Sequence, residues 1–283
     1  MDAPAGELII AEPGIARLLA PNPSAYTFTG TQVHLVGESE LAIIDPGPEI
    51  PQHVDALLAA IAGRPVVAIL VTHTHRDHSP ASRALGQATG APIMGCAPLT
   101  LDEGTRADAG FDHHYSPDRV LGEGDGIQVD GRRLTAVFTP GHTSNHLCFA
   151  DEASGALFTG DHVMGWSTSV VIPPDGNMGD YMRSLEKLRQ RSDRIYYPAH
   201  GEPVTDPQRL VRGMLTHRVQ RERQVLRLVG EGNRTVEMIV HAAYPGIDPR
   251  LVPAAGASVL AHLLDLRERG LVQSQDEQWT PSD

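Results

Sequence analysis

The sequence has few cysteines, no long apolar run at its start and little positive charge. Only two of its 283 residues are cysteines, Cys96 and Cys148, which is too few for a disulfide framework. Both lie in apolar runs typical of buried free thiols. Residues 1–14 contain neither a basic segment nor a long apolar stretch, so we expect no signal peptide and no transmembrane helix. These absences favour a cytoplasmic protein.

The charge of the chain is acidic and unevenly distributed. The formal net charge is −12, and all of this excess falls within residues 1–205, because residues 206–283 carry equal numbers of basic and acidic side chains. Such an acidic part disfavours non-specific binding to RNA, DNA or anionic membranes. Apolar residues make up 41% of the chain, enough for a sizeable core. The length fits one large domain and one small domain.

Short apolar runs alternate with helical patterns in the first part of the chain. Residues 41–44 and 66–71 are predicted to form buried strands, and residues 54–61 show the i, i+3, i+4, i+7 spacing of a helix face. This alternation predicts an α/β fold. Further strands are expected at residues 134–138, 147–150, 156–159 and 195–197. A histidine or aspartate cluster follows nearly every one of these strands, and strand ends are where ligands gather in α/β folds.

The pattern changes at Asp206. A long arginine-rich helix is expected from there to Gly230, followed by a short helix capped by Thr235 and by a third helix around residues 259–264. Residues 271–272 begin a predicted β-wing. Three helices and a wing give a winged-helix outline, so we predict two domains, at residues 1–205 and 206–283.

The centre of the predicted chemistry is the segment Thr72-His73-Thr74-His75-Arg76-Asp77-His78, with the pattern H-x-H-x-D-H. Imidazole and carboxylate groups are the ligands that divalent metals such as zinc prefer. Alternate residues of an extended loop point the same way, so His73 and His75 can share one ion. Asp77 and His78 lie further along and can face a second ion. The alternative is a polar loop of solvated histidines, which three later segments make less favourable.

Each of those segments places one more ligand candidate after a predicted strand. They are Thr139-Pro140-Gly141-His142-Thr143, Phe158-Thr159-Gly160-Asp161-His162 and Tyr197-Pro198-Ala199-His200-Gly201. Their glycine and proline residues favour tight turns, which let the side chains converge.

The order and spacing of these motifs over residues 26–205 resemble the metallo-β-lactamase superfamily. The resemblance implies a four-layer αβ/βα fold and a centre of two zinc ions per chain, with iron or manganese as alternatives. It also implies a role for each ligand candidate: His73, His75 and His142 on one ion, Asp77, His78 and His200 on the other, Asp161 bridging both, and Asp45 buttressing the site from outside.

Two cations about 3.5–4 Å apart lower the pKa of a shared water towards neutrality, so that it can attack a carbonyl or phosphoryl group. Asp77 is expected to orient this water and to accept its proton. His75 stands where flavin-linked diiron relatives carry Glu, which favours hydrolysis over redox chemistry. Asp161 stands where one large class of true β-lactamases carries Cys, which disfavours that class.

Residues 30–37, 160–166 and 217–222 resemble the lactamase-beta-like protein 2 group, which shares a small winged-helix-like C-terminal domain. The animal mitochondrial members of that group are single-strand endoribonucleases. The sequence departs from the group at Gln32-Val33-His34 and again at residues 167–178.

Three further side chains have two interpretations each. His146 is either a donor or proton relay next to the metal ligands, or a hydrogen-bonded structural histidine. His34 either lines the mouth of the pocket or belongs to the core. Trp166, five residues after Asp161, either forms an apolar wall for the substrate or packs in the core or an interface.

Three functions compete on this basis. We favour a hydrolase acting on a small ester, thioester, lactone or amide, with weak β-lactamase activity as one form of it. An endoribonuclease is the alternative that the group resemblance implies, although the acidic charge disfavours RNA. A binding module without catalysis is disfavoured because the ligand set is complete. The partner is therefore expected to be a small molecule and not a membrane, with a homodimer left open.

The ligand set predicts the metal content. Seven ligand residues can fill two sites, so protein purified without chelator should carry about two zinc ions per chain by elemental analysis. Protein that takes up no transition metal even after reconstitution would contradict the assignment.

Overall fold

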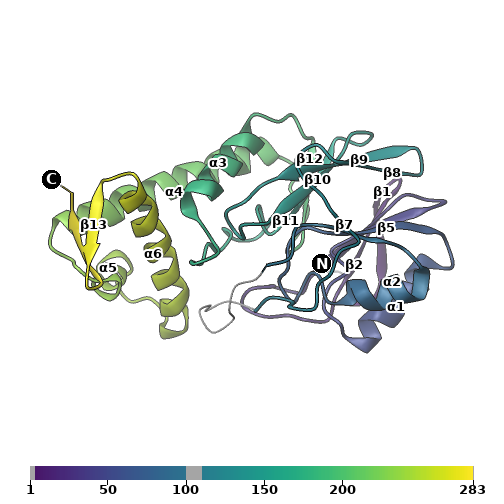
Figure 1. Ribbon diagram of the computed structural model, residues 1–283, viewed down its shortest axis with the longest axis horizontal. Helices are drawn as coiled ribbons and strands as arrows, with labels where there is room; N and C mark the ends of the chain where they lie inside the picture. The colour runs from purple at the N-terminus through teal and green to yellow at the C-terminus, as the bar shows by residue number, and fades with distance from the viewer. Residues whose placement is uncertain (1–3, 100–109, 283) are drawn as a thin grey trace.

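The computed structural model describes residues 4–99 and 110–282 and contains two β-sheets that pack face to face (Figure 1). The first sheet has seven strands, which lie in chain order from β1 to β7. Its first four strands are antiparallel, and from β4 onward each strand runs parallel to the next. The strands are β1 (Leu8–Glu12), β2 (Ile15–Leu19), β3 (Gln32–Val36), β4 (Leu41–Ile44), β5 (Val66–Val71), β6 (Ile93–Gly95) and β7 (Arg119–Val120).

The second sheet has five strands in the order β12-β11-β10-β9-β8. All neighbours in it are antiparallel except β11 and β12, which are parallel. The strands are β8 (Gly126–Val129), β9 (Arg132–Phe138), β10 (Leu147–Asp151), β11 (Ala156–Gly160) and β12 (Ile195–Pro198). The strands predicted from apolar runs are therefore confirmed.

Helices cover the outer face of each sheet. Helices α1 (Pro51–Ile61) and α2 (Ala81–Thr89) pack their apolar residues Leu57, Ile61 and Leu85 on the first sheet. Helices α3 (Met178–Arg189) and α4 (Pro207–Gly230) cover the second sheet. The apolar layer between the sheets completes the core, and strands β4, β10 and β11 are buried at every residue because they are covered on both faces. The predicted four-layer α/β architecture is confirmed (Figure 1).

The C-terminal elements have a core of their own. They are α5 (Val236–Ala243), the 3₁₀ turn η2 (Pro249–Leu251), α6 (Val252–Glu268), β13 (Val272–Gln275) and β14 (Gln278–Pro281). Ile239, Val259, Leu263 and Trp279 are buried in this core. The Thr235 side chain accepts a hydrogen bond from the backbone N–H of Met238, so it caps α5 as predicted. The winged-helix outline is confirmed.

Helix α4 is shared by both parts of the chain. Val211 and Met214, in its first half, pack in the core cluster of α3 and the second sheet. Val225 and Leu228, in its second half, belong to the C-terminal core. Figure 1 shows α4 running from the sheet towards the C-terminal elements. None of the helices in the described part of the chain is long and apolar enough to span a membrane.

Arg218 on α4 is a buried cation that holds a loop of the first part. Its side chain is 4% exposed, its Nη2 donates a hydrogen bond to the backbone carbonyl of Ser169, and its guanidinium lies 5.1 Å from the ring centroid of Tyr181. Within residues 4–99 and 110–282, no carboxylate forms an ion pair with it. A buried charge of this kind is tolerated only where hydrogen bonds and ring contacts compensate for its lost hydration.

We expect Arg218→Ala to lower the free energy of unfolding by about 1–3 kcal/mol, because the buried Ser169 carbonyl loses its donor. Urea denaturation measures the change. Arg223→Ala is the matched control, since Arg223 is an exposed arginine one and a half turns further along α4, and its effect should stay within about 0.5 kcal/mol. Equal effects of the two substitutions would show that the Ser169 contact contributes nothing.

Candidate metal centre and active site

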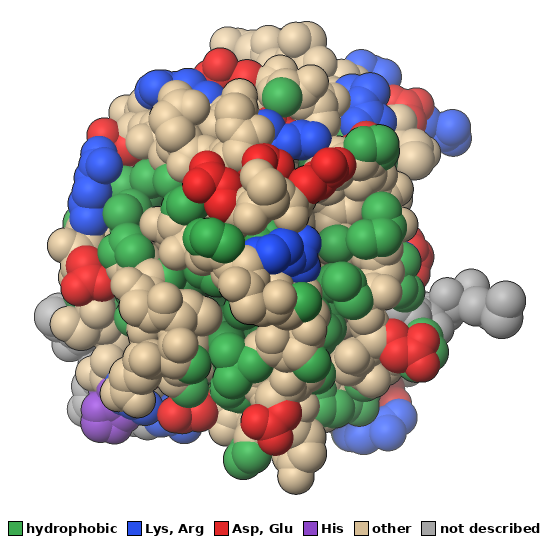
Figure 2. Space-filling model, turned by 90° about the vertical axis from the view of Figure 1, so that its right-hand side faces the viewer, with side chains coloured by type: hydrophobic (Ala, Val, Ile, Leu, Met, Phe, Trp, Pro, Cys, Tyr) green, Lys and Arg blue, Asp and Glu red, His purple; other side chains and the backbone are tan. Residues whose placement is uncertain are grey.

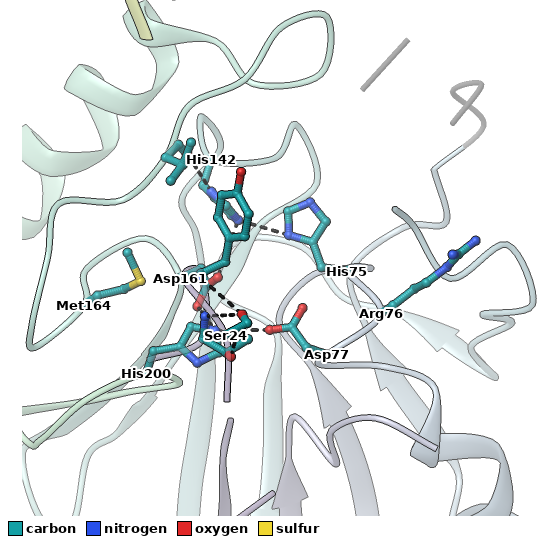
Figure 3. A pocket seen from close by; sticks show the side chains of 11 residues that line it. Ser24, His75, Arg76, Asp77, His142, Asp161, Met164 and His200 are labelled. Carbon is teal, nitrogen blue, oxygen red and sulfur yellow. Dashed lines mark hydrogen bonds and ion pairs between the residues drawn. The ribbon is translucent and has the colours of Figure 1, made fainter. Parts of the chain in front are cut away.

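The ligand candidates converge at one edge of the two sheets, because each follows a strand that ends there. The segment from His73 to His78 follows β5, and Asp161 and His200 follow β11 and β12. His142 lies in the turn between β9 and β10. Figure 3 shows these side chains pointing towards one another from different loops. The convergence expected at the strand ends is therefore observed.

Three imidazoles and one carboxylate form the first ligand group. His75 Nδ1 lies 2.9 Å from His73 Nε2 and 3.2 Å from His142 Nε2. Asp161 Oδ2 lies 4.0 Å from His73 Nε2 and 3.7 Å from His142 Nε2. All four residues are buried, and their ligand atoms lie within 4.8 Å of one another.

The second ligand group consists of Asp77, His78 and His200. Asp77 Oδ2 lies 3.3 Å from His78 Nε2 and 3.1 Å from His200 Nε2. Asp161 also borders this group, with Oδ1 at 3.3 Å from His200 Nε2 and Oδ2 at 3.6 Å from His78 Nε2. The carboxylate of Asp161 therefore stands between the two groups, as expected of a bridging ligand.

The outer ring nitrogens show that the inner ones are suited to a metal. His142 Nδ1 donates a hydrogen bond to the Val170 carbonyl at 2.6 Å, and His200 Nδ1 donates one to the Gly30 carbonyl at 3.1 Å. A carbonyl only accepts, so Nδ1 of both rings carries a proton, and Nε2 is the nitrogen that faces the other ligand candidates. Buried ring nitrogens and carboxylate oxygens that crowd together in this way are stabilised when a cation lies between them. The residues therefore fit a divalent metal ion.

Asp45 supports both ligand groups from behind, as its predicted buttressing role requires. Its Oδ1 accepts the backbone N–H of Thr72 at 2.8 Å, and its Oδ2 accepts the Thr72 hydroxyl at 2.7 Å and the His78 Nδ1–H at 3.0 Å. The Thr72 hydroxyl oxygen lies 3.0 Å from His73 Nδ1. Contacts of this kind fix the orientation of the metal-binding rings.

His146 is fully buried and contacts the backbone of Asp161. Its Nε2 accepts the Asp161 N–H at 3.2 Å, and its Nδ1 lies 2.9 Å from the Thr139 hydroxyl oxygen. Gly160 makes this close approach feasible, because it has a φ of +49° and a Cβ there would lie 2.7 Å from His146 Nε2. The geometry agrees with a hydrogen-bonded histidine that holds the Asp161 loop in place.

The histidines and carboxylates of the site shift one another's pKa. Burial disfavours the charged form of His200, but the carboxylates of Asp161 and Asp77 outweigh it and raise the pKa of His200 to about 10. Burial also disfavours the charged forms of Asp77 and Asp161. The neighbouring histidines outweigh this effect and hold the pKa of each carboxyl well below its usual value. Both carboxylates are therefore negative at neutral pH and attract cations.

A cavity of about 200 Å³ opens beside the ligand groups. Figure 3 shows Met164 on one side of it and Arg76 on the other, with the Arg76 guanidinium turned away from the ligands. The residues around the cavity that are not ligands were not predicted, because they lie in loops without periodicity. They are Ser24, Tyr26, Thr27, Arg76, Met164 and Val170.

Of the two interpretations of His34, the position in the core is confirmed and the position at the pocket mouth is wrong. His34 lies on β3, is 3% exposed and packs its ring against Phe158 and Tyr197 between the sheets, at centroid distances of 5.1 and 5.7 Å. Burial and the positive charge of Arg17 lower the pKa of His34 to about 3, so it is neutral. Trp166 is 39% exposed and stacks on Phe28, and its role in substrate binding remains a prediction.

Comparison with known families identifies the fold and its appendage. The model of the metallo-beta-lactamase superfamily matches residues 26–200, and that of the beta-lactamase associated winged helix domain matches residues 235–279. The chain belongs to the metallo-beta-lactamase superfamily. The predicted fold class and family resemblance are confirmed, and so is the coarser functional prediction of a metallo-beta-lactamase family hydrolase with a His/Asp cluster for metal.

Related proteins of this superfamily include named thioesterases. An atrochrysone carboxyl ACP thioesterase from Aspergillus chevalieri is 32% identical over 247 residues, covering 82% of this chain and 73% of the relative. The lactamase-like protein ptaB from Pestalotiopsis fici is 29% identical and covers 84% of this chain and 75% of its own. Among solved structures, a beta-lactamase domain protein from Burkholderia ambifaria superposes with a TM-score of 0.81 at 21% identity, covering 98% of this chain and 94% of its own.

We expect Asp45→Ala to weaken metal binding by about 10- to 100-fold, because His78 and Thr72 lose the group that orients them. Competition with a chelator of known affinity measures the change. Asp130→Ala is the matched control: Asp130 also has a left-handed backbone, with φ 49° against 48° for Asp45, and also accepts three hydrogen bonds, but from Glu38 and Ser39. Unchanged metal affinity in the Asp45 variant would refute the buttressing role.

Proposed function

We propose that this protein is a metal-dependent thioesterase with two zinc ions. The observation that carries the proposal is the Asp161 carboxylate between two groups of metal-binding side chains, at the floor of a cavity that is partly apolar. The thioesterases among the relatives favour a thioester over the ester, lactone and amide alternatives. His73, His75 and His142 would hold one ion, Asp77, His78 and His200 the other, and Asp161 both.

The bound metals would polarise the thioester carbonyl and lower the pKa of the attacking water. Asp77 borders the cavity and contacts His78 and His200, which supports a role for its carboxylate in accepting a hydrogen bond from this water. Asp77 then takes the proton as the water oxygen bonds to the carbonyl carbon. The C–S bond breaks and the proton held by Asp77 passes to the leaving sulfur, so that one carboxylic acid and one thiol result and the Asp77 carboxylate is restored.

The apolar side of the cavity suits the rest of the substrate. Tyr26, Met164 and Val170 line it and can bury the carbon atoms of an acyl group. Val170 has a second function, because its carbonyl accepts the hydrogen bond that orients His142. A change in the Val170 loop is therefore expected to affect both substrate binding and metal binding.

Cleavage of RNA has less support. Arg76 is the only lysine or arginine among the described residues that line the cavity, whereas RNA binding requires several cations along a groove. On the one face that Figure 2 shows, blue side chains lie scattered among red and apolar ones.

We expect Asp77→Asn to lower kcat for thioester hydrolysis by at least about 100-fold, because the asparagine amide cannot take the proton from water. Release of thiol from S-acetyl-N-acetylcysteamine, followed with a thiol-reactive dye, measures turnover. The fold should persist by circular dichroism. Asp118→Asn is the control, since Asp118 is exposed and its carboxylate accepts the Ile93 N–H on β6. A kcat near that of the wild type in the Asp77 variant would refute its role.

Assays of thioester hydrolysis and of RNA cleavage, run side by side, separate the two candidate reactions. Zinc-loaded protein should hydrolyse the thioester with little dependence on salt, since the substrate is neutral. Efficient cleavage of single-stranded RNA near physiological salt, lost in the Asp77→Asn variant, would instead establish a nuclease and contradict the thioesterase proposal.

A further inference from the structure

Three large aromatic side chains lie exposed on the two loops, residues 20–31 and 161–177, that contribute to the lining of the cavity. Tyr26, Phe28 and Trp166 are 40%, 41% and 39% exposed, although aromatic side chains of this size are usually well buried. The rings of Phe28 and Trp166 are stacked, with centroids 4.9 Å apart and an interplanar angle of 15°. Tyr26 lines the cavity itself. We refer to these three residues as the aromatic rim.

Phe28, which stacks on Trp166, has a strained backbone. Its φ is +57°, a left-handed conformation that bulky residues rarely adopt. The surrounding turn enforces it: the Thr27 hydroxyl donates to the Asn22 carbonyl at 2.6 Å, and the Gly30 N–H donates to the Thr27 carbonyl at 2.9 Å. Strain of this kind persists only when neighbouring contacts impose it, and it is concentrated at binding and catalytic sites.

The loop that carries Phe28 also supports the ligand groups. The Gly30 carbonyl accepts the hydrogen bond from His200, and the Thr31 hydroxyl lies 3.5 Å from Asp77 Oδ2. Trp166 rests on the turn after His200, because a Cβ at Gly201 would lie only 3.1 Å from Trp166 Cδ1. The rim is therefore held at a fixed position relative to the atoms that react.

We propose that the aromatic rim binds the acyl group of the substrate and selects thioesters whose acyl group contains a planar, apolar ring system. This inference rests on the proposed thioesterase function. The cavity of about 200 Å³ is smaller than pockets that enclose a drug-sized ligand, so a large acyl group must extend over the rim. Flat aromatic faces stack well on another ring, whereas a flexible alkyl chain loses more conformational entropy when it is fixed there.

The test compares three N-acetylcysteamine thioesters: acetyl, hexanoyl and 2-naphthoyl. The wild-type protein should have the highest kcat/KM for the 2-naphthoyl thioester. Phe28→Gly is the main variant, because glycine accepts the positive φ and removes only the ring. It should lower kcat/KM for the 2-naphthoyl thioester about tenfold, mainly through KM, and lower that for the acetyl thioester much less. Trp166→Leu should act in the same way.

Phe138→Ala is the matched control. Phe138 is a phenylalanine of nearly the same exposure, 39%, but it lies on β9, where its backbone bonds to Glu123 and Lys187. It should leave all three substrates unchanged. Selection of planar acyl groups by the rim is refuted if Phe28→Gly lowers kcat/KM equally for the acetyl and 2-naphthoyl thioesters. It is also refuted if the hexanoyl thioester has the same kcat/KM as the 2-naphthoyl one in the wild type and loses as much of it in Phe28→Gly.

A binding measurement separates this inference from the proposed function. The thioether S-(2-naphthylmethyl)-N-acetylcysteamine cannot be hydrolysed, and titration calorimetry should show that Phe28→Gly weakens its binding about tenfold. Thioether binding that depends on Phe28, with no hydrolysis of any thioester, would support the rim and refute the thioesterase. Thioester hydrolysis, together with thioether binding that does not depend on Phe28, would support the thioesterase and refute the rim. Binding of single-stranded RNA that is tighter than that of the thioether, and lost in Phe28→Gly, would overturn the choice of ligand.

Discussion

The buried carboxylate of Asp45 is the group on which the geometry of the site depends. A carboxylate that is 2% exposed is costly unless its oxygens accept hydrogen bonds, and here the backbone and hydroxyl of Thr72 and the ring of His78 donate to it. The need to satisfy this one charge fixes the start of the ligand loop after β5. His73, next to Thr72, and His78 then take orientations that direct their Nε2 atoms inward.

Sequence alone predicted the ligand candidates because they lie in short motifs, each next to an apolar strand. The chain order of β5, β9, β11 and β12 and the turns after them were enough to bring seven side chains together. The sequence left two positions open for His34, the pocket mouth and the core. It could not decide between them because Phe158 and Tyr197, which pack on the ring from the second sheet, are remote in sequence.

Other parts of the site could not be predicted because their positions depend on contacts that are remote in sequence. Tyr26, Met164 and Val170 meet around one cavity although they come from two loops, at residues 20–31 and 161–177, with no periodic pattern. Arg218 is a comparable case. In the sequence it is one of several arginines on the predicted helix, whereas the structure buries it against Tyr181 and Ser169. Ser169 adjoins Val170, whose carbonyl orients His142. Helix α4 therefore contacts a loop that supports one of the ligand candidates.

The continuity of α4 also limits how the two parts of the chain can be recombined. A chimera that exchanged the C-terminal part at a junction near residue 205 would remove Val211 and Met214 from the core over the second sheet, as well as the Arg218 support of the Ser169 loop. A junction beyond Val229 would keep these contacts but would divide the C-terminal core, to which Val225, Leu228 and Val229 belong. The first half of α4 thus belongs with the two sheets and its second half with the winged helix. A successful graft would have to join the two halves within one uninterrupted helix.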